Sequence, residues 1–191
     1  MRTIDIHSHV LTEETMALIG KEVAALKPWL TRIDADNFAM EVAGTSYRPF
    51  PLGGFELERR FADMAASEVD MQVISATPQT YFYEQEPAAA AACAVVQNEG
   101  IAKLVKAHPD RFIGIATLPL QDGGLAAKEL TRALRTLGLR GAMIGSNANG
   151  TNLDHPSYEP LWAAAAELGA FMLIHPTNVA GAGRLMQSHR P

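Results

Sequence analysis

Cysteine, basic runs and long apolar runs are scarce in this sequence of 191 residues. The single cysteine, Cys93, excludes a disulfide bond within the chain, and its alanine-rich surroundings indicate a small core residue. Lysine and arginine number 16 against 21 aspartates and glutamates, which gives a net charge of −5. Because no basic run stands out, we expect no nucleic-acid partner, and we interpret Arg59 and Arg60 as part of an exposed helix face.

No apolar run reaches the roughly 18 residues that a membrane-spanning helix needs. The N-terminus, MRTIDIHSHV, also lacks an apolar run of signal-peptide length. We therefore expect a cytoplasmic protein with no membrane partner. The apolar content of 48% is enough for a sizeable core.

Two common catalytic motifs are also missing. No glycine-rich phosphate loop follows a strand, since GSNANG at residues 145–150 lacks the dinucleotide-binding pattern. No G-x-S-x-G is present, so a serine hydrolase is unsupported.

Short β-rich runs alternate with helical patterns along the chain. Continuous apolar runs of this kind are typical of strands that are covered on both faces in a parallel sheet. The five expected strands cover residues 3–7, 71–77, 112–118, 140–146 and 170–176.

Helices are expected between these strands. Apolar residues at helical spacing precede the second strand, and an alanine-rich segment at 87–107 precedes the third. A further stripe at 130–137 is followed by Gly138 as a stop signal. Ser157 is expected to cap a last helix, with Pro160 in its first turn and Gly169 at its end.

Residues 12–54 interrupt this alternation. Their prolines and glycines indicate an insertion, with a helix at about 13–27 and then a loop that folds over the sheet end. Elsewhere the repeated βα pattern predicts parallel βαβ units. Five strands are too few to close an eight-stranded barrel but could form an open doubly wound sheet, so the pattern alone leaves both architectures open.

His7 and His9 lie at the carboxyl end of the first strand, where sites form in α/β proteins. Side chains two apart on a strand point to one face, so two imidazoles can reach one metal ion. Asp5 has the same parity and is expected to support them. His175 ends the fifth strand, and its arrival at the same rim predicts a three-histidine Zn²⁺ site, although Mn²⁺ or Fe²⁺ would also suit these ligands.

The remaining candidates lie in loops. Arg48 follows the first strand, where an arginine could bind a substrate carboxylate or be only an exposed charge. Tyr81, Phe82 and Tyr83 follow the second strand, where they either wall a pocket for a planar substrate or pack the loop. The other histidines are interpreted as structural or left unplaced. They are His108, His155 and His189.

Five segments, in order along nearly the whole chain, resemble the amidohydrolase-2 family of the amidohydrolase superfamily. They are IDIHSHVL, ELERRFADMAASEVDMQVIS, HPDRFIGIATLPLQD, GLRGAMIGSNANG and HPSYEPLWAAAAELGAFMLIHP. The resemblance implies a (β/α)8 TIM barrel of which this chain contains about the first five βα units, with residues 1–191 as the N-terminal part of one domain. It also implies that His7, His9 and His175 bind the metal and that Arg48 binds the substrate carboxylate.

The function that the resemblance implies is non-oxidative decarboxylation of an unsaturated or aromatic carboxylic acid. A homodimer is expected, because members often complete the pocket with an arginine of the partner. The general-acid histidine and the acidic metal ligand are expected beyond Pro191, so we expect the chain to be part of a longer protein. Two alternatives stay open, namely a hydrolase or hydratase on the same scaffold and a truncated, catalytically silent domain.

Overall fold

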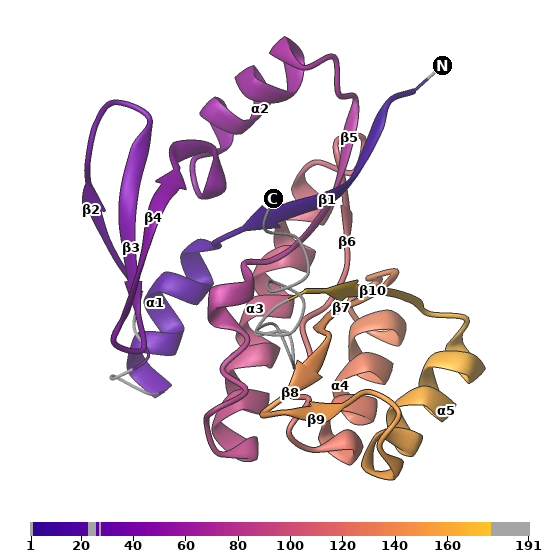
Figure 1. The fold of residues 1–191 in the computed structure, drawn as a ribbon. Helices are drawn as coiled ribbons and strands as arrows, with labels where there is room; N and C mark the ends of the chain where they lie inside the picture. Colours follow the sequence, from indigo (N-terminus) through magenta and orange to yellow (C-terminus); the bar gives the residue numbers. More distant parts are fainter. Residues whose placement is uncertain (1, 23–25, 27, 177–191) are drawn as a thin grey trace, which may run out of the picture.

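The computed structural model describes residues 2–22, 26 and 28–176 of the chain (Figure 1). All five strands predicted from the apolar runs are present and parallel, although the third is shorter than predicted and ends at Gly114. They are β1 (Ile4–Val10), β5 (Met71–Ala76), β6 (Phe112–Gly114), β7 (Gly141–Gly145) and β10 (Phe171–His175).

The spatial order of these strands follows their order in the sequence. β1 pairs with β5 and β5 with β6, while β7 pairs with β10. Beyond the end of β6 the chain continues the pairing, because the Ala116 amide donates to the Gly141 carbonyl and the Met143 amide donates to the Ala116 carbonyl, each at 2.8 Å. The described strands therefore form one array without the reversal of order that an open doubly wound sheet has at its switch point.

This five-stranded array is strongly curved. In a flat sheet with strands about 4.8 Å apart, the two outer strands would lie roughly 19 Å from each other. Here the outer strands are β1 and β10, yet the ring centroids of His7 and His175 are only 5.0 Å apart. The carboxyl ends of the first and last strands are thus brought together over the concave face.

Helices lie between the parallel strands along the chain, as the sequence predicted, and pack against them (Figure 1). The last helix begins differently from the prediction, because the amide of Ser157 donates to the His155 imidazole Nδ1 and a short 3₁₀ turn precedes the helix. Ser157 is therefore not the cap, whereas Gly169 ends this helix in the left-handed conformation as expected. The helices are α2 (Leu57–Ala66), α3 (Pro87–Ala107), α4 (Gly123–Arg135) and α5 (Glu159–Leu168).

The insertion contains more regular structure than the sequence predicted. Its helix, α1 (Glu13–Glu22), falls in the expected place, but the segment predicted to be a loop forms an antiparallel sheet. Its hairpin turn, Ala43–Gly44, has positive φ at both residues, which matches the twist of paired strands. Pro49 and Pro51 were misleading because they lie on an edge strand of this sheet, where a missing N–H costs no ladder bond. The three strands are β2 (Trp29–Arg32), β3 (Asn37–Val42) and β4 (Thr45–Pro51).

Two hydrophobic clusters hold the described residues together. The larger one lies between the parallel strands and the helices α3, α4 and α5, with Ile74, Phe112 and Ile144 fully buried. The smaller one joins the insertion to the strand ends and includes Phe50 and Cys93, so Cys93 is a core residue as predicted. A small hairpin, β8 (Asn147–Ala148) and β9 (Thr151–Asn152), follows β7. Within the described residues, no helix is both long and apolar enough to cross a membrane.

A substitution at Gly141 on β7 tests the close pairing of β7 with β10. A Cβ atom at this position would lie 1.8 Å from the carbonyl oxygen of Phe171. We expect Gly141→Ala to lower the free energy of unfolding by about 1–3 kcal/mol, as overpacking does elsewhere, measured by urea unfolding.

Gly124→Ala is the matched control, because its Cβ would meet only the Asp122 carboxylate, at 3.2 Å, and alanine favours the helix there. Equal stability of the Gly141→Ala and wild-type chains would contradict the close strand approach.

Candidate metal centre

An irregularity in β1 sets the positions of the first two histidines. Asp5 pairs with Gln72 and Ser8 pairs with Ile74, so two residues of β1 lie opposite the single residue Val73. This is a β-bulge, a feature that re-aims side chains and is frequent beside active sites. The residues in the bulge are Ile6 and His7.

The bulge separates Asp5 from the histidines. Paired residues of neighbouring strands share a face, and Gln72 and Ser75 are three apart on a regular strand, so Asp5 and His9 lie on opposite faces. The expectation that Asp5 supports the imidazoles by parity is therefore wrong. Its carboxylate instead accepts the backbone amide of His7 at 3.0 Å and the Gln72 side-chain amide at 3.1 Å.

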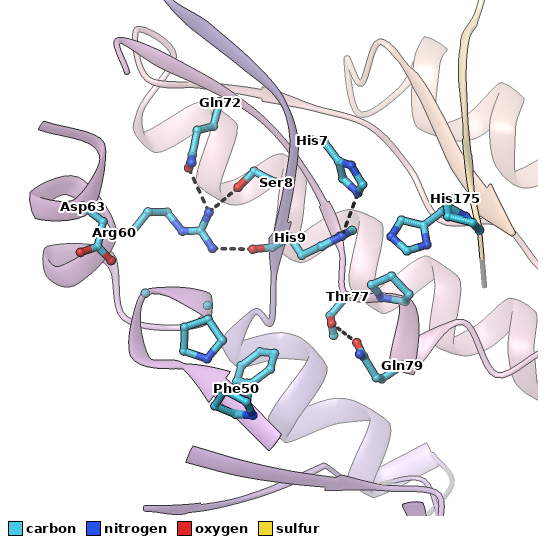
Figure 2. Close-up of a pocket in the computed structure, with 16 residues that line it drawn as sticks. His7, Ser8, His9, Phe50, Arg60, Asp63, Gln72, Thr77, Gln79 and His175 are labelled. Atoms are coloured by element: carbon cyan, nitrogen blue, oxygen red, sulfur yellow. Dashed lines mark hydrogen bonds between the residues drawn. The ribbon is translucent and has the colours of Figure 1, made fainter. Parts of the chain in front are cut away.

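The three predicted histidines meet at one point (Figure 2). The Nε2 atoms of His7 and His9 lie 3.1 Å apart, and all three imidazoles offer a nitrogen within 4.8 Å of the others. His175 comes from β10, beside Gly145 of β7, and its ring centroid is 5.2 Å from that of His9. The spacing of the motif and the end of the fifth strand thus identified the members of this cluster.

This geometry fits a divalent metal ion. Two nitrogen ligands of a tetrahedral Zn²⁺ lie roughly 3.3 Å apart, given Zn–N distances of about 2.0–2.1 Å, and the His7–His9 pair is close to that separation. Each neutral imidazole has one nitrogen with a free lone pair, and within the described residues no carboxylate joins the three rings, so the donor set is three nitrogens.

The surroundings of His9 keep its imidazole unprotonated. Burial, followed by the nearby imidazoles of His7 and His175, lowers its pKa to about 4. The Ser75 hydroxyl donates to the Ser8 carbonyl at 3.1 Å and lies 3.3 Å from His9 Nδ1, so it can accept the Nδ1 proton. The Nε2 lone pair of His9 is then directed at the cluster, as metal ligation requires.

His175 has the same electrostatic character. Burial and the neighbouring His7 lower its pKa from the ordinary value. Both rings are therefore neutral at pH 7, and neutral imidazoles are the form that binds metals.

A pocket of about 640 Å³ opens beside the three histidines, within the size range of small-molecule sites. One wall is apolar and comes from the end of β4 and the turn after it, with Pro49, Phe50 and Pro51. Thr77 and Gln79, which share a hydrogen bond, lie on the other side (Figure 2). The arrangement places polar groups near the histidines and apolar surface opposite.

Arg60 also lines this pocket, which corrects its interpretation as an exposed helix residue. Its side chain is buried with only 6% exposed, and burial lowers the pKa of its guanidinium to about 10, so the group stays charged at neutral pH. A signal was available in the sequence, because Arg60 lies three and four residues from Leu57 and Met64 on the apolar face of α2. Arg59, one residue earlier, points to the surface carboxylates of Asp36 and Asp63 as an exposed residue should.

The predicted substrate-binding residues lie outside the residues that line the histidine pocket. Arg48 is exposed on β4, next to the lining residue Pro49. Tyr81 and Phe82 are buried in the two hydrophobic clusters and line a separate cavity of about 370 Å³. Tyr83 is also buried, and its hydroxyl accepts the Gly145 amide at 3.0 Å. Their assignment to a substrate stays a prediction.

His108 and His155 have local structural roles, as predicted. His108 ends α3 and packs its ring against Phe61 and Phe112. His155 caps the turn before α5. His189 lies outside the described residues.

The sequence profile of the amidohydrolase family matches residues 4–190. The chain belongs to this family. As an amidohydrolase it is 34% identical to 2-amino-3-carboxymuconate-6-semialdehyde decarboxylase of Dictyostelium discoideum, over 98% of this chain and 52% of that protein. It therefore spans about half the length of this curated relative.

Two solved structures are also similar to this amidohydrolase. The 5-carboxyvanillate decarboxylase of Novosphingobium aromaticivorans, solved with manganese and 4-hydroxy-3-methoxy-5-nitrobenzoic acid, has a TM-score of 0.72 at 21% identity, over 98% of this chain and 54% of that one. A dihydroxybenzoic acid decarboxylase of Polaromonas, solved with manganese and 2-nitroresorcinol, has a TM-score of 0.68 at 24% identity, over 99% and 54%. At these identities the likeness establishes a shared fold.

His175→Ala tests the cluster directly. The variant removes one of three convergent imidazoles, so we expect metal affinity to fall by more than about tenfold. A tenfold fall is the smallest effect typical of losing a group that only supports a ligand. Metal content after dialysis against Mn²⁺ or Zn²⁺, measured by elemental analysis, reports the change.

The control is His155→Ala, which removes a histidine remote from the cluster. Equal metal content in the His175→Ala and wild-type chains would rule out a shared site.

Proposed function

We propose that this chain is the metal-binding part of a (β/α)8-barrel decarboxylase that removes CO₂ from a small aromatic or unsaturated carboxylic acid. The single observation that carries the proposal is the convergence of His7, His9 and His175 beside a pocket of about 640 Å³. Family membership supports it, as do the names of the relatives, which are decarboxylases of such acids. The barrel is supported by five parallel strands in sequence order and by their curvature.

The metal in the proposal is a divalent ion held by the three imidazoles. Manganese in two similar structures supports a divalent ion, whereas the preference for Zn²⁺ rests only on the three-histidine donor set. When bound, such an ion acts as a Lewis acid toward substrate oxygens and stabilises the charge left on the substrate as CO₂ departs.

The histidines and the apolar wall of the pocket have separate roles in this proposal. The neutral rings of His9 and His175 keep their lone pairs available at pH 7, so no proton must be displaced before ligation. Phe50 and the flanking prolines offer an apolar surface against which a planar acid can lie and from which water is excluded. The general acid is not assigned among the described residues.

Decarboxylation itself is the first test of this proposal. We expect the whole protein of which this chain is proposed to be a part, loaded with Mn²⁺ or Zn²⁺, to release CO₂ from one member of a panel of hydroxybenzoic and unsaturated dicarboxylic acids, and expect chelator treatment to abolish the release. Isotope-ratio detection of ¹³CO₂ from carboxyl-labelled acids is the measurement.

The alternatives give different products. Water addition or ring opening without CO₂ would favour a hydratase or hydrolase. Binding of less than about a tenth of an equivalent of metal, with no turnover, would favour a silent domain.

Arg48 is proposed to bind the substrate carboxylate from the rim of the pocket, beside Pro49. We expect Arg48→Met to lower kcat/KM by about 10- to 100-fold, in keeping with the loss of a charged hydrogen bond, while metal content stays constant. Steady-state kinetics of CO₂ release measure the effect.

Arg32→Met is the control, since Arg32 is an exposed arginine of the same sheet that binds backbone carbonyls at the surface. Equal kinetics for Arg48→Met and wild type would remove Arg48 from the site.

A further inference from the structure

The guanidinium of Arg60 crosses from α2 to the strand that carries two metal ligands (Figure 2). Its Nη1 donates to the Ser8 hydroxyl at 2.8 Å and to the Gln72 side-chain oxygen at 3.0 Å. Its Nη2 donates to the backbone carbonyl of His9. These three hydrogen bonds go to β1 and its neighbour β5, so the guanidinium that lines the pocket also holds these two strands.

The bonds continue through Gln72 to the other side of the bulge. Gln72 donates to the Asp5 carboxylate at 3.1 Å, and the same carboxylate accepts the backbone amide of His7 at 3.0 Å. One connected set thus binds the backbone of His7 through Asp5 and that of His9 directly. It brackets the bulge from both sides, and we call these residues the bulge clamp: Asp5, Gln72, Arg60 and Ser8.

The partners of Arg60 explain why a charge is tolerated at 6% exposure. A buried guanidinium must be paired and hydrogen-bonded, and the nearby carboxylates of Asp5 and Asp63 supply opposite charge. A planar fork with several fixed donors can bind a hydroxyl, an amide oxygen and a carbonyl at once, whereas lysine is a point donor. The site therefore uses the geometry of arginine as well as its charge.

We propose that Arg60 is a positioning residue for the metal centre: through the bulge clamp it fixes the backbone of His7 and His9, and hence the distance and angle between their imidazoles. The inference rests on the proposed metal site and goes beyond it. Outer partners of this kind orient ligands and tune the metal without touching it. The backbone of a bulge lacks regular ladder bonds and so depends on side-chain partners for its shape.

Co²⁺ is the probe for the test, because its visible absorption reports ligand geometry and its affinity can be measured by competition with a chromophoric chelator. In the full chain, we expect Arg60→Met to weaken Co²⁺ binding by about 10- to 100-fold and to alter the absorption bands. Arg60→Lys retains the charge but lacks the planar set of donors, so its Co²⁺ affinity should lie between those of Arg60→Met and wild type.

Arg135→Met is the control, since it removes an exposed arginine of α4 whose partner is the surface carboxylate of Glu167. We expect its Co²⁺ affinity to stay within about twofold of wild type, as for loss of an exposed ion pair. An Arg60→Met chain that is folded by circular dichroism and has wild-type affinity and spectrum overturns the inference.

Gln72→Leu is the second variant if Arg60→Met does not fold. It breaks the link between Arg60 and Asp5 while keeping the side-chain size, so weaker Co²⁺ binding with altered bands supports the clamp and wild-type behaviour overturns it. Failure of the wild-type chain to bind Co²⁺ would instead reject the proposed metal site. The two failures are therefore distinguishable.

Discussion

The extra residue in β1 is the constraint on which the site depends. It leaves His7 and His9 on the concave face and turns Asp5 toward α2, so β1 contributes functional side chains to both of its faces. On one surface the imidazoles converge with His175, and on the other a buried arginine holds the backbone. A regular strand of the same sequence would place Asp5 beside the histidines and on the face opposite to Ser8, so Asp5 and Ser8 could not both belong to the bulge clamp.

Curvature is the second constraint, and it makes a site from distant segments. Because the five parallel strands stand in sequence order and bend, the carboxyl ends of β1 and β10 meet, although they are the outer strands. The antiparallel sheet of the insertion then supplies the apolar wall of the pocket through Pro49, Phe50 and Pro51. The polar side chains of the pocket thus come mainly from the parallel strands, and part of its apolar wall comes from the insertion.

The sequence predicted the repeating part of this fold and the convergence of His7, His9 and His175. Apolar runs located all five parallel strands, and an H-x-H after one strand with His175 after another identified the cluster. The prediction for the insertion was wrong because Pro49 and Pro51 suggest a loop, whereas an edge strand tolerates them. The bulge was not predicted because strand register depends on tertiary partners. The apolar face of α2 did carry a signal for the burial of Arg60, but no local pattern encodes its hydrogen bonds to Ser8 and Gln72.

The position of the three histidines on the first and last described strands has a mechanical consequence. An ion bound by His7, His9 and His175 would act as a cross-link that closes a loop containing nearly the whole described chain. Closing so long a loop removes much chain entropy from the unfolded state, and ligand binding to the folded state alone adds stability by mass action. The concentration of free metal would then affect how stably β1 and β10 are held together, so that folding and metal binding are coupled equilibria.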